Sequence, residues 1–279
     1  MKNTVFTLTL VSFLVMASCW ASESPRLAVH IQTAQFHICC AEQDREIAPS
    51  VLSQCEDRLA ALTRDFARPC DATFTLFMYP DIDTFHEAMS WPDGPAWYTS
   101  SWNLEKYQYF FISPNRPGPY HSSQNIRKQI DLAITKIFMA NTCRGGYDAL
   151  PHWFRHGVAC LHADHTSPSA ETRKALAARA VEDPRHLPTF DELCAWDIND
   201  DRRVLKDLER TKFFVASSYT LAEFIHEKWG WGTLLTLFDN YASLEKTLGM
   251  NRETFYKEWI SFVVKKYGTK TGPLSVRPQ

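Results

Sequence analysis

Segments with the apolar spacing of β-strands occur only in the first half of this chain, and that restriction decides which fold classes the sequence can adopt. Short runs at 72–79 and 107–112 show the alternation and the aromatic content of β-strands. From Ser122 onward, apolar residues recur every three or four positions, which is the spacing of the buried face of a helix. The sequence therefore predicts an α+β protein, with a small mixed lobe over 27–121, a helical lobe over 122–267 and a flexible tail over 268–279.

Turn residues separate the expected elements of the mixed lobe. An extended segment is expected over 27–40, and Pro49 begins a helix that ends before Pro69. The buried stripe of this helix is predicted to consist of Val51, Cys55, Leu59, Leu62 and Phe66. Asp81 is expected to cap a short helix that runs through Met89.

The helical lobe is divided by glycine and proline. Its first helix carries a predicted buried stripe of Ile126, Ile130, Ile134, Ile137 and Phe138. Gly145 and Gly146 interrupt the chain after it, and Pro151 suits the first turn of the next helix. Further helices are expected over 170–181, 202–229, 233–241 and 252–267.

The N-terminus predicts export. A single positive charge precedes a short apolar run over 5–17, which is too short for a stop-transfer helix. Segment 16–19 resembles a bacterial lipobox, which would leave Cys19 as a lipidated N-terminus, whereas cleavage after Ala21 would give a soluble protein. We therefore expect a signal peptide at 1–21, or a lipoprotein signal ending before Cys19, and a location in the bacterial cell envelope or periplasm or outside the cell. No later segment is apolar enough to cross a bilayer, so this lipid is the one membrane attachment expected.

The charge balance excludes partners that are recognised by charge alone. The chain has 30 Lys and Arg residues against 32 Asp and Glu residues. Nucleic acids and anionic membrane surfaces both attract strongly basic proteins. The sequence therefore predicts neither as a partner.

Seven cysteines follow Cys19, and export permits disulfides between them. Because seven is odd, at least one thiol stays unpaired within the chain. Their spacing does not match a zinc ribbon or finger, so a structural role is expected for them, bridged or buried. The pairing itself cannot be read from the sequence.

The segment 150–159, Leu-Pro-His-Trp-Phe-Arg-His-Gly-Val-Ala, is the most specific motif of the chain. It resembles the second metal-ligand helix of the gluzincin zinc peptidases and, more narrowly, of the secreted peptidase MA-like family. In that family a Glu stands immediately before the Gly and binds zinc. Here this position is occupied by His156.

Other segments follow in the order of the same family. They are 77–83, 111–114, 187–193, 219–230, 248–249 and 258–259. The resemblance covers nearly the whole mature chain and implies a gluzincin, thermolysin-like architecture. It also implies an H-E-x-x-H motif one helix upstream of the 150–159 segment, because two His residues one turn apart hold zinc and the Glu activates the bound water.

No H-E-x-x-H occurs in the chain. Aligning the upstream helix on its apolar stripe places Lys128 and Leu132 at the two ligand positions and Gln129 at the position of the Glu. A charged Lys has no lone pair, Leu has no donor atom, and the amide of Gln cannot take the proton. We therefore predict a degenerate site, which His156 completes together with Tyr219, a match to a Tyr on the helix that closes the family's cleft.

A different metal site is the main alternative. Its ligand set would be His152, His156, His162 and His165, with Cys160 and Asp164 nearby. The first two are four residues apart on one helical face, and imidazoles of this kind bind zinc and related ions. Otherwise His152 is expected to face solvent, while His162 and His165 end a helix, where cations suit the helix dipole.

The sequence as a whole predicts an exported pseudopeptidase with no cofactor. Its expected role is to bind a peptide or protein segment in the inherited cleft, or to act as a structural component of the envelope. The rival interpretation is an active metal-dependent hydrolase or peptidase, with zinc held by ligands around His156. A third is an envelope lipoprotein with no ligand in the cleft.

Overall fold

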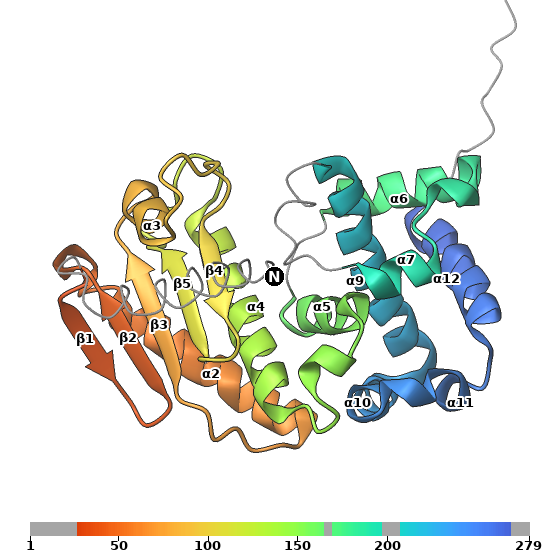
Figure 1. Ribbon diagram of the computed structural model, residues 1–279, viewed down its shortest axis with the longest axis horizontal. Helices are drawn as coiled ribbons and strands as arrows, with labels where there is room; N and C mark the ends of the chain where they lie inside the picture. Colours follow the sequence, from red (N-terminus) through yellow and green to blue (C-terminus); the bar gives the residue numbers. More distant parts are fainter. Residues whose placement is uncertain (1–26, 165–168, 197–206, 269–279) are drawn as a thin grey trace, which may run out of the picture. The chain divides into compact units, whose positions relative to one another are not determined.

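The computed structural model describes residues 27–164, 169–196 and 207–268 (Figure 1). The predictions for the signal peptide and for Cys19 therefore lie outside the described residues, as does nearly all of the predicted tail. The chain forms two compact units that divide after Phe138. The described residues combine one five-stranded sheet with ten α-helices, which confirms the α+β class.

The first unit is built on a mixed sheet with the strand order β1-β2-β3-β5-β4. The strands are β1 (Val29–Gln32), β2 (Phe36–Cys40), β3 (Phe74–Tyr79), β4 (Ser100–Asn103) and β5 (Gln108–Ile112). The three central strands run parallel, and one antiparallel strand flanks them on each side. The strands predicted at 72–79 and 107–112 are confirmed as β3 and β5, and the extended segment at 27–40 divides into β1 and β2.

A threonine makes the turn between β1 and β2. The backbone N–H of Thr33 donates to the carbonyl oxygen of Phe36 at 2.8 Å, and the N–H of Phe36 donates to Oγ1 of Thr33 at 3.2 Å. A side-chain hydroxyl can close a turn in this way without glycine or proline. The residue pattern alone therefore predicts one extended segment where the chain folds back on itself.

Two long helices carry most of the core of the first unit. They are α2 (Ala48–Phe66), which packs on β2, and α4 (Ser123–Thr142), most of which belongs to this unit. Both predicted apolar stripes are buried. The rings of Phe66 and Phe138 meet edge to face with centroids 5.3 Å apart, so the two stripes meet at their C-terminal ends. The compact units thus divide within α4, whereas the sequence pattern places the boundary before this helix.

A buried carboxylate ties the loop after β2 to the loop after β5. Asp44 ends the short helix η1 (Glu42–Asp44) and has no exposed surface. It accepts a hydrogen bond from Oγ of Ser113 at 2.6 Å, and both its oxygens accept from Nη2 of Arg116 at 2.7 Å. A buried charge is tolerated when its oxygens are satisfied in this way.

The second unit is helical. Its helices are α5 (His152–His162), α6 (Ala170–Glu182), α7 (Phe190–Ala195), α9 (Leu208–Trp229), α10 (Trp231–Asp239), α11 (Leu244–Leu248) and α12 (Arg252–Tyr267). The helices predicted at 170–181, 233–241 and 252–267 are confirmed as α6, α10 and α12. The helix predicted from residue 202 begins at Leu208 in the described residues, and the short helices α7 and α11 are additional. No helix among the described residues combines the length and apolar character that a bilayer crossing requires.

Helix starts in both units are fixed by short polar side chains. The capping residues are Asp81 before α3 (Ile82–Ala88), Ser169 before α6, Thr189 before α7, Asp207 before α9 and Asn251 before α12. Each accepts a hydrogen bond from a backbone N–H in the first turn, which has no partner within the helix. The predicted cap at Asp81 is confirmed.

Helices α5 and α9 cross in close contact at the centre of the second unit, and a glycine permits this crossing. A Cβ atom at Gly157 would lie 2.1 Å from the carbonyl oxygen of Ser218 and 3.1 Å from Cβ of Ala222. On the far side of α9, Nε1 of the fully buried Trp259 donates to Oγ1 of Thr220 at 3.1 Å. The glycine of the 150–159 motif therefore has a packing role that does not depend on metal chemistry.

Candidate functional site

The three residues at the predicted motif positions lie along α4 in the first unit. Leu132 is buried, and Lys128 and Gln129 are half-buried. Oε1 of Gln129 accepts a hydrogen bond of 3.4 Å from Oγ1 of Thr99, the residue immediately before β4. The side-chain amide of Gln129 thus forms a hydrogen bond within the first unit.

A carboxyl group on the same helix shapes the electrostatics there. Asp131 accepts a hydrogen bond from Nε2 of Gln54 at 2.8 Å, which links α4 to α2. Burial raises the pKa of Asp131, while the bond from Gln54 and the charges of Arg58, Arg127 and Lys128 act in the opposite direction. The positive charge of Lys128 therefore acts on a carboxyl group one residue before Leu132, which the sequence analysis predicts at a lost ligand position.

The side chains predicted for the two ligand positions on α4 do not fit a zinc ion. Lys128 offers an ammonium group without a lone pair, and Leu132 offers no donor atom. Oε1 of Gln129 already accepts a hydrogen bond from Thr99. Zinc sites need about three or four protein ligands, so α4 gives no support to the peptidase chemistry of the family.

The other two predicted site residues, His156 and Tyr219, lie in the second unit. His156 is buried on α5, with Nε2 3.4 Å from Sγ of Cys160. Tyr219 is half-buried on α9, and the guanidinium of Arg173 lies 5.2 Å from the centre of its ring. Burial raises the pKa of Tyr219, which keeps its hydroxyl protonated at neutral pH. Because these residues belong to a different unit from the α4 residues, their convergence on one cleft stays a prediction.

The alternative histidine set is brought together in part. The rings of His152 and His156 stack with centroids 5.6 Å apart and an angle of 22°. The ring of His162 lies instead beside Trp231, with centroids 5.2 Å apart, and His165 lies outside the described residues. The expectation that His152 faces solvent is wrong, because it is only 6% exposed. Its ring lies under the edge of Trp196, which the residue pattern did not reveal.

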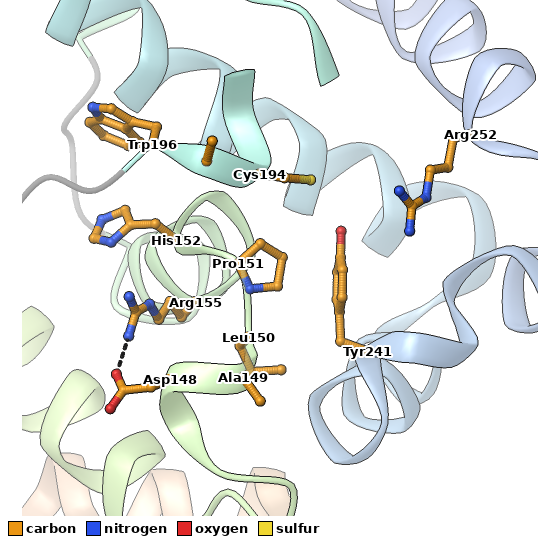
Figure 2. Close-up of a pocket in the computed structure, with 11 residues that line it drawn as sticks. Asp148, Ala149, Leu150, Pro151, His152, Arg155, Cys194, Trp196, Tyr241 and Arg252 are labelled. Atoms are coloured by element: carbon orange, nitrogen blue, oxygen red, sulfur yellow. Dashed lines mark hydrogen bonds and ion pairs between the residues drawn. The ribbon is translucent and has the colours of Figure 1, made fainter. Parts of the chain in front are cut away.

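A pocket of about 440 Å³ opens around the N-terminus of α5 in the second unit (Figure 2). Its lining consists of Asp148, Ala149, Leu150, Pro151, His152, Arg155, Cys194, Ala195, Trp196, Tyr241 and Arg252. These residues come from α5 and the turn before it, from the end of α7, and from the starts of η4 (Tyr241–Ser243) and α12. Of the residues predicted from the sequence, His152 lines this pocket.

Two arginines lie on different sides of the pocket. Nη1 of Arg155 is paired with Oδ1 of Asp148 at 2.8 Å, and that carboxylate is 97% exposed. Figure 2 shows Arg252 beyond Tyr241, on the opposite side of Pro151 from Arg155. Nε of Arg252 lies 3.8 Å from the nearest oxygen of Glu245, which is a loose contact for an ion pair. The guanidinium of Arg252 is therefore available to a second carboxylate.

Tyr241 and Cys194 contribute neutral polar groups to the pocket. The hydroxyl of Tyr241 accepts a hydrogen bond of 3.1 Å from Nε1 of Trp153. Burial raises the pKa of Tyr241 and that of the Cys194 thiol. A protonated thiol is a poor nucleophile, because the thiolate is the reactive form. The pocket therefore contains hydrogen-bonding groups but no activated nucleophile among the described residues.

The N-terminus of α5 adds to the positive character of the pocket. Pro151 precedes the helix, and no side chain caps its first turn. The first N–H groups of a helix carry a partial positive charge, which favours an anion nearby. Together with Arg252, this end of α5 suits the binding of a carboxylate.

The sequence motif locates one wall of this pocket but not the others. Cys194, Tyr241 and Arg252 come from segments with no distinctive pattern, and they meet only when the helices are packed. No model of a known protein family matches this chain, and no curated protein sequence matches it significantly.

Proposed function

We propose that this chain is an exported, non-catalytic protein with a gluzincin-like frame that binds a peptide or protein segment. The loss of donor atoms at Lys128 and Leu132 supports the absence of zinc peptidase chemistry. The resemblance in the 150–159 segment supports descent from a frame that holds peptides. Binding without cleavage is the function that remains when the chemistry is removed from such a frame.

The observation that carries the binding proposal is the pocket beside α5. It offers the guanidinium of Arg252, the N-terminus of α5 and the apolar surfaces of Leu150, Pro151 and Trp196. A guanidinium binds a carboxylate with two parallel hydrogen bonds, and the apolar surfaces suit a neighbouring side chain. A peptide that ends in a free carboxylate next to an apolar residue has this chemistry.

Peptide binding provides the test. We expect peptides with a free C-terminal carboxylate to bind the full chain and the matching amides to bind at least about tenfold more weakly, since a charge-assisted pair is lost. Arg252→Gln should reduce the affinity for the free acids to that of the amides. Titration calorimetry measures both effects.

Arg185→Gln is the matched control, because Arg185 is an exposed arginine of the same unit that does not line the pocket. It should leave peptide binding unchanged. Equal affinity for acids and amides would contradict the assignment of Arg252, and chelator-sensitive cleavage of any peptide would overturn the non-catalytic function.

The metal-dependent hydrolase remains the second candidate, because one observation favours it. His152, His156 and Cys160 follow one another at intervals of four residues on α5, and Nε2 of His156 lies 3.4 Å from Sγ of Cys160. Hydrolysis that requires zinc and is lost in His156→Ala would establish this alternative.

The proposed location is the bacterial cell envelope or periplasm, or outside the cell, with the protein either free or attached through Cys19. The supporting residues are the short apolar run and the lipobox-like segment at 16–19. Membrane fractionation of the wild type and of Cys19→Ala distinguishes the two forms. A lipid-anchored protein should leave the membrane fraction when this cysteine is replaced.

A further inference from the structure

The hairpin at the edge of the sheet brings two histidines and one cysteine onto the same face. In the antiparallel register, His30 on β1 lies opposite Cys39 on β2. His37 precedes Cys39 by two residues, and side chains two apart on a strand point to the same side. Their neighbours Ile38 and Cys40 point to the other side, into the core, and have no exposed surface. Figure 1 shows β1 and β2 at one end of the sheet.

The three potential ligand atoms lie close together. Nδ1 of His30 and Nε2 of His37 are 3.1 Å apart, and Sγ of Cys39 lies 3.6 Å from each of them. Among the described residues, no other three His, Cys, Asp or Glu side chains bring their ligand atoms within 4.8 Å of one another. The cluster is therefore distinct from the histidines of α5 and from the pocket.

The three distances match the corners of a tetrahedral metal site. Zinc bonds of about 2.0–2.1 Å to nitrogen and about 2.3 Å to sulfur, at tetrahedral angles, separate two nitrogens by about 3.4 Å and nitrogen from sulfur by about 3.6 Å. The two sulfur–nitrogen distances agree with these values, and the nitrogen–nitrogen distance is 0.3 Å shorter. An ion above the face of the three atoms would have its fourth position directed away from them.

The surroundings of the cluster suit an ion that prefers nitrogen and sulfur. Cys39 is buried, His37 is half-buried and His30 is exposed. The site is therefore enclosed by protein on the side of Cys39 and accessible to solvent on the side of His30. Imidazole and thiolate together favour zinc and its neighbours over magnesium or calcium. Burial raises the pKa of the Cys39 thiol to about 11, so binding would release its proton.

We propose that Nδ1 of His30, Nε2 of His37 and Sγ of Cys39 form a binding site for a divalent transition-metal ion, with Zn²⁺ as the ion that fits its geometry. The ion links β1 to β2 at the open edge of the sheet. Its fourth position is left to a solvent molecule or to a donor of another molecule. This site is independent of the peptide-binding proposal, because it involves neither the pocket nor α5.

Cobalt provides the test, because Co²⁺ substitutes for zinc and its absorption reports its ligands. We expect the chelator-treated full chain to bind one equivalent of Co²⁺ with the d–d bands of a tetrahedral site and a sulfur-to-metal charge-transfer band. Zn²⁺ should displace the cobalt and remove both signals. Cys39→Ser should abolish the charge-transfer band, and His37→Ala should weaken cobalt binding by more than about tenfold.

His30→Ala is the decisive variant, because His30 is exposed on an edge strand and its loss does not disturb the core. It should also weaken cobalt binding by more than about tenfold, with an unchanged circular dichroism spectrum. His121→Ala, at a half-buried histidine of the same unit, and Cys143→Ser are the matched controls and should bind as the wild type does. Cobalt spectra that are unchanged in Cys39→Ser, or affinity that is retained in His30→Ala, would overturn the site.

Discussion

Two histidine pairs with nearly the same ring geometry occur in this protein, one on a sheet and one on a helix. The rings of His30 and His37 have centroids 5.3 Å apart at 29°, and those of His152 and His156 have centroids 5.6 Å apart at 22°. Each pair also has a cysteine nearby. In the sheet pair Sγ of Cys39 lies 3.6 Å from both imidazoles, whereas on α5 Sγ of Cys160 lies 3.4 Å from Nε2 of His156.

The difference comes from how each element directs its side chains. In the hairpin, residues from two antiparallel strands face one another, so three side chains can surround one point. On a helix, residues four apart lie one above the other and point in the same direction, so a third ligand has to come from another element. The i, i+4 spacing of two histidines on a helix is easy to recognise in a sequence, but it does not assemble a set of three ligands by itself. The cross-strand arrangement of the hairpin does so without a recognisable spacing.

The largest expected effect concerns the packing of α5, which carries the helical pair, against α9. Gly157→Ala should destabilise the second unit by about 3 kcal/mol, because the new Cβ would overlap the backbone of Ser218 on α9. Denaturant unfolding followed by tryptophan fluorescence measures the loss. Cobalt binding at the sheet pair should persist at denaturant concentrations that do not unfold the first unit.

Gly232→Ala is the matched control, since no atom lies within 4 Å of a Cβ at that position in α10. Replacing a helical glycine there should leave stability unchanged or raise it by about 0.5–1 kcal/mol. If Gly157→Ala were as stable as this control, the close contact of α5 and α9 would not be what holds the helical pair in place.

The second expected effect distinguishes the two pairs directly. Zinc at about 100 times its dissociation constant stabilises a folded site by about 2.7 kcal/mol, which corresponds to roughly 100-fold slower hydrogen exchange for amides that open with the site. We expect this slowing in β1 and β2 and no change in α5. Hydrogen exchange with and without zinc measures this slowing. Slower exchange in α5, with no change in the hairpin, would show that zinc binds at the helical pair.

The smallest expected effect concerns pH and the first unit. Burial holds the pKa of Asp131 above its unfolded value of 3.8, so the folded state binds this proton more readily than the unfolded chain. The contribution of this group to stability is therefore least favourable above the folded-state pKa. It improves as pH falls through that pKa and levels off below 3.8.

Asp131→Asn should remove this dependence and raise stability at neutral pH slightly, since an amide oxygen can still accept the bond from Gln54. Unfolding at neutral pH and at pH 4 checks it. Asp57→Asn, at an exposed carboxyl on α2, should change neither value. A dependence that survives Asp131→Asn would place the titrating group elsewhere.

Periodicity predicted most of the fold because the core elements carry it. The stripes of α2 and α4 and the alternation in β3 and β5 all reflect burial of one face, which the sequence records directly. Strand β4, Ser-Ser-Trp-Asn, has four half-buried residues and no apolar alternation, so it could not be recognised. The hairpin was missed because the hydroxyl of Thr33, and no glycine or proline, makes its turn.

The candidate sites were less predictable, because both depend on pairing between elements. His152 was identified from its spacing on one helix, but Tyr241 and Arg252 join it only through the packing of later segments. His30 and Cys39 are nine residues apart, and only the strand register makes them neighbours. A residue pattern records periodicity within an element but not which elements will meet.

The adjacent cysteines of β2 have opposite surroundings. Because a strand alternates its side chains, the sulfur of Cys39 lies on the histidine face while that of Cys40 is enclosed in the core. A disulfide between neighbours would require the pleat of a central strand to be broken. The pleat of β2 therefore excludes the neighbouring thiol of Cys40 as a disulfide partner for Cys39 and leaves the sulfur of Cys39 facing the two imidazoles.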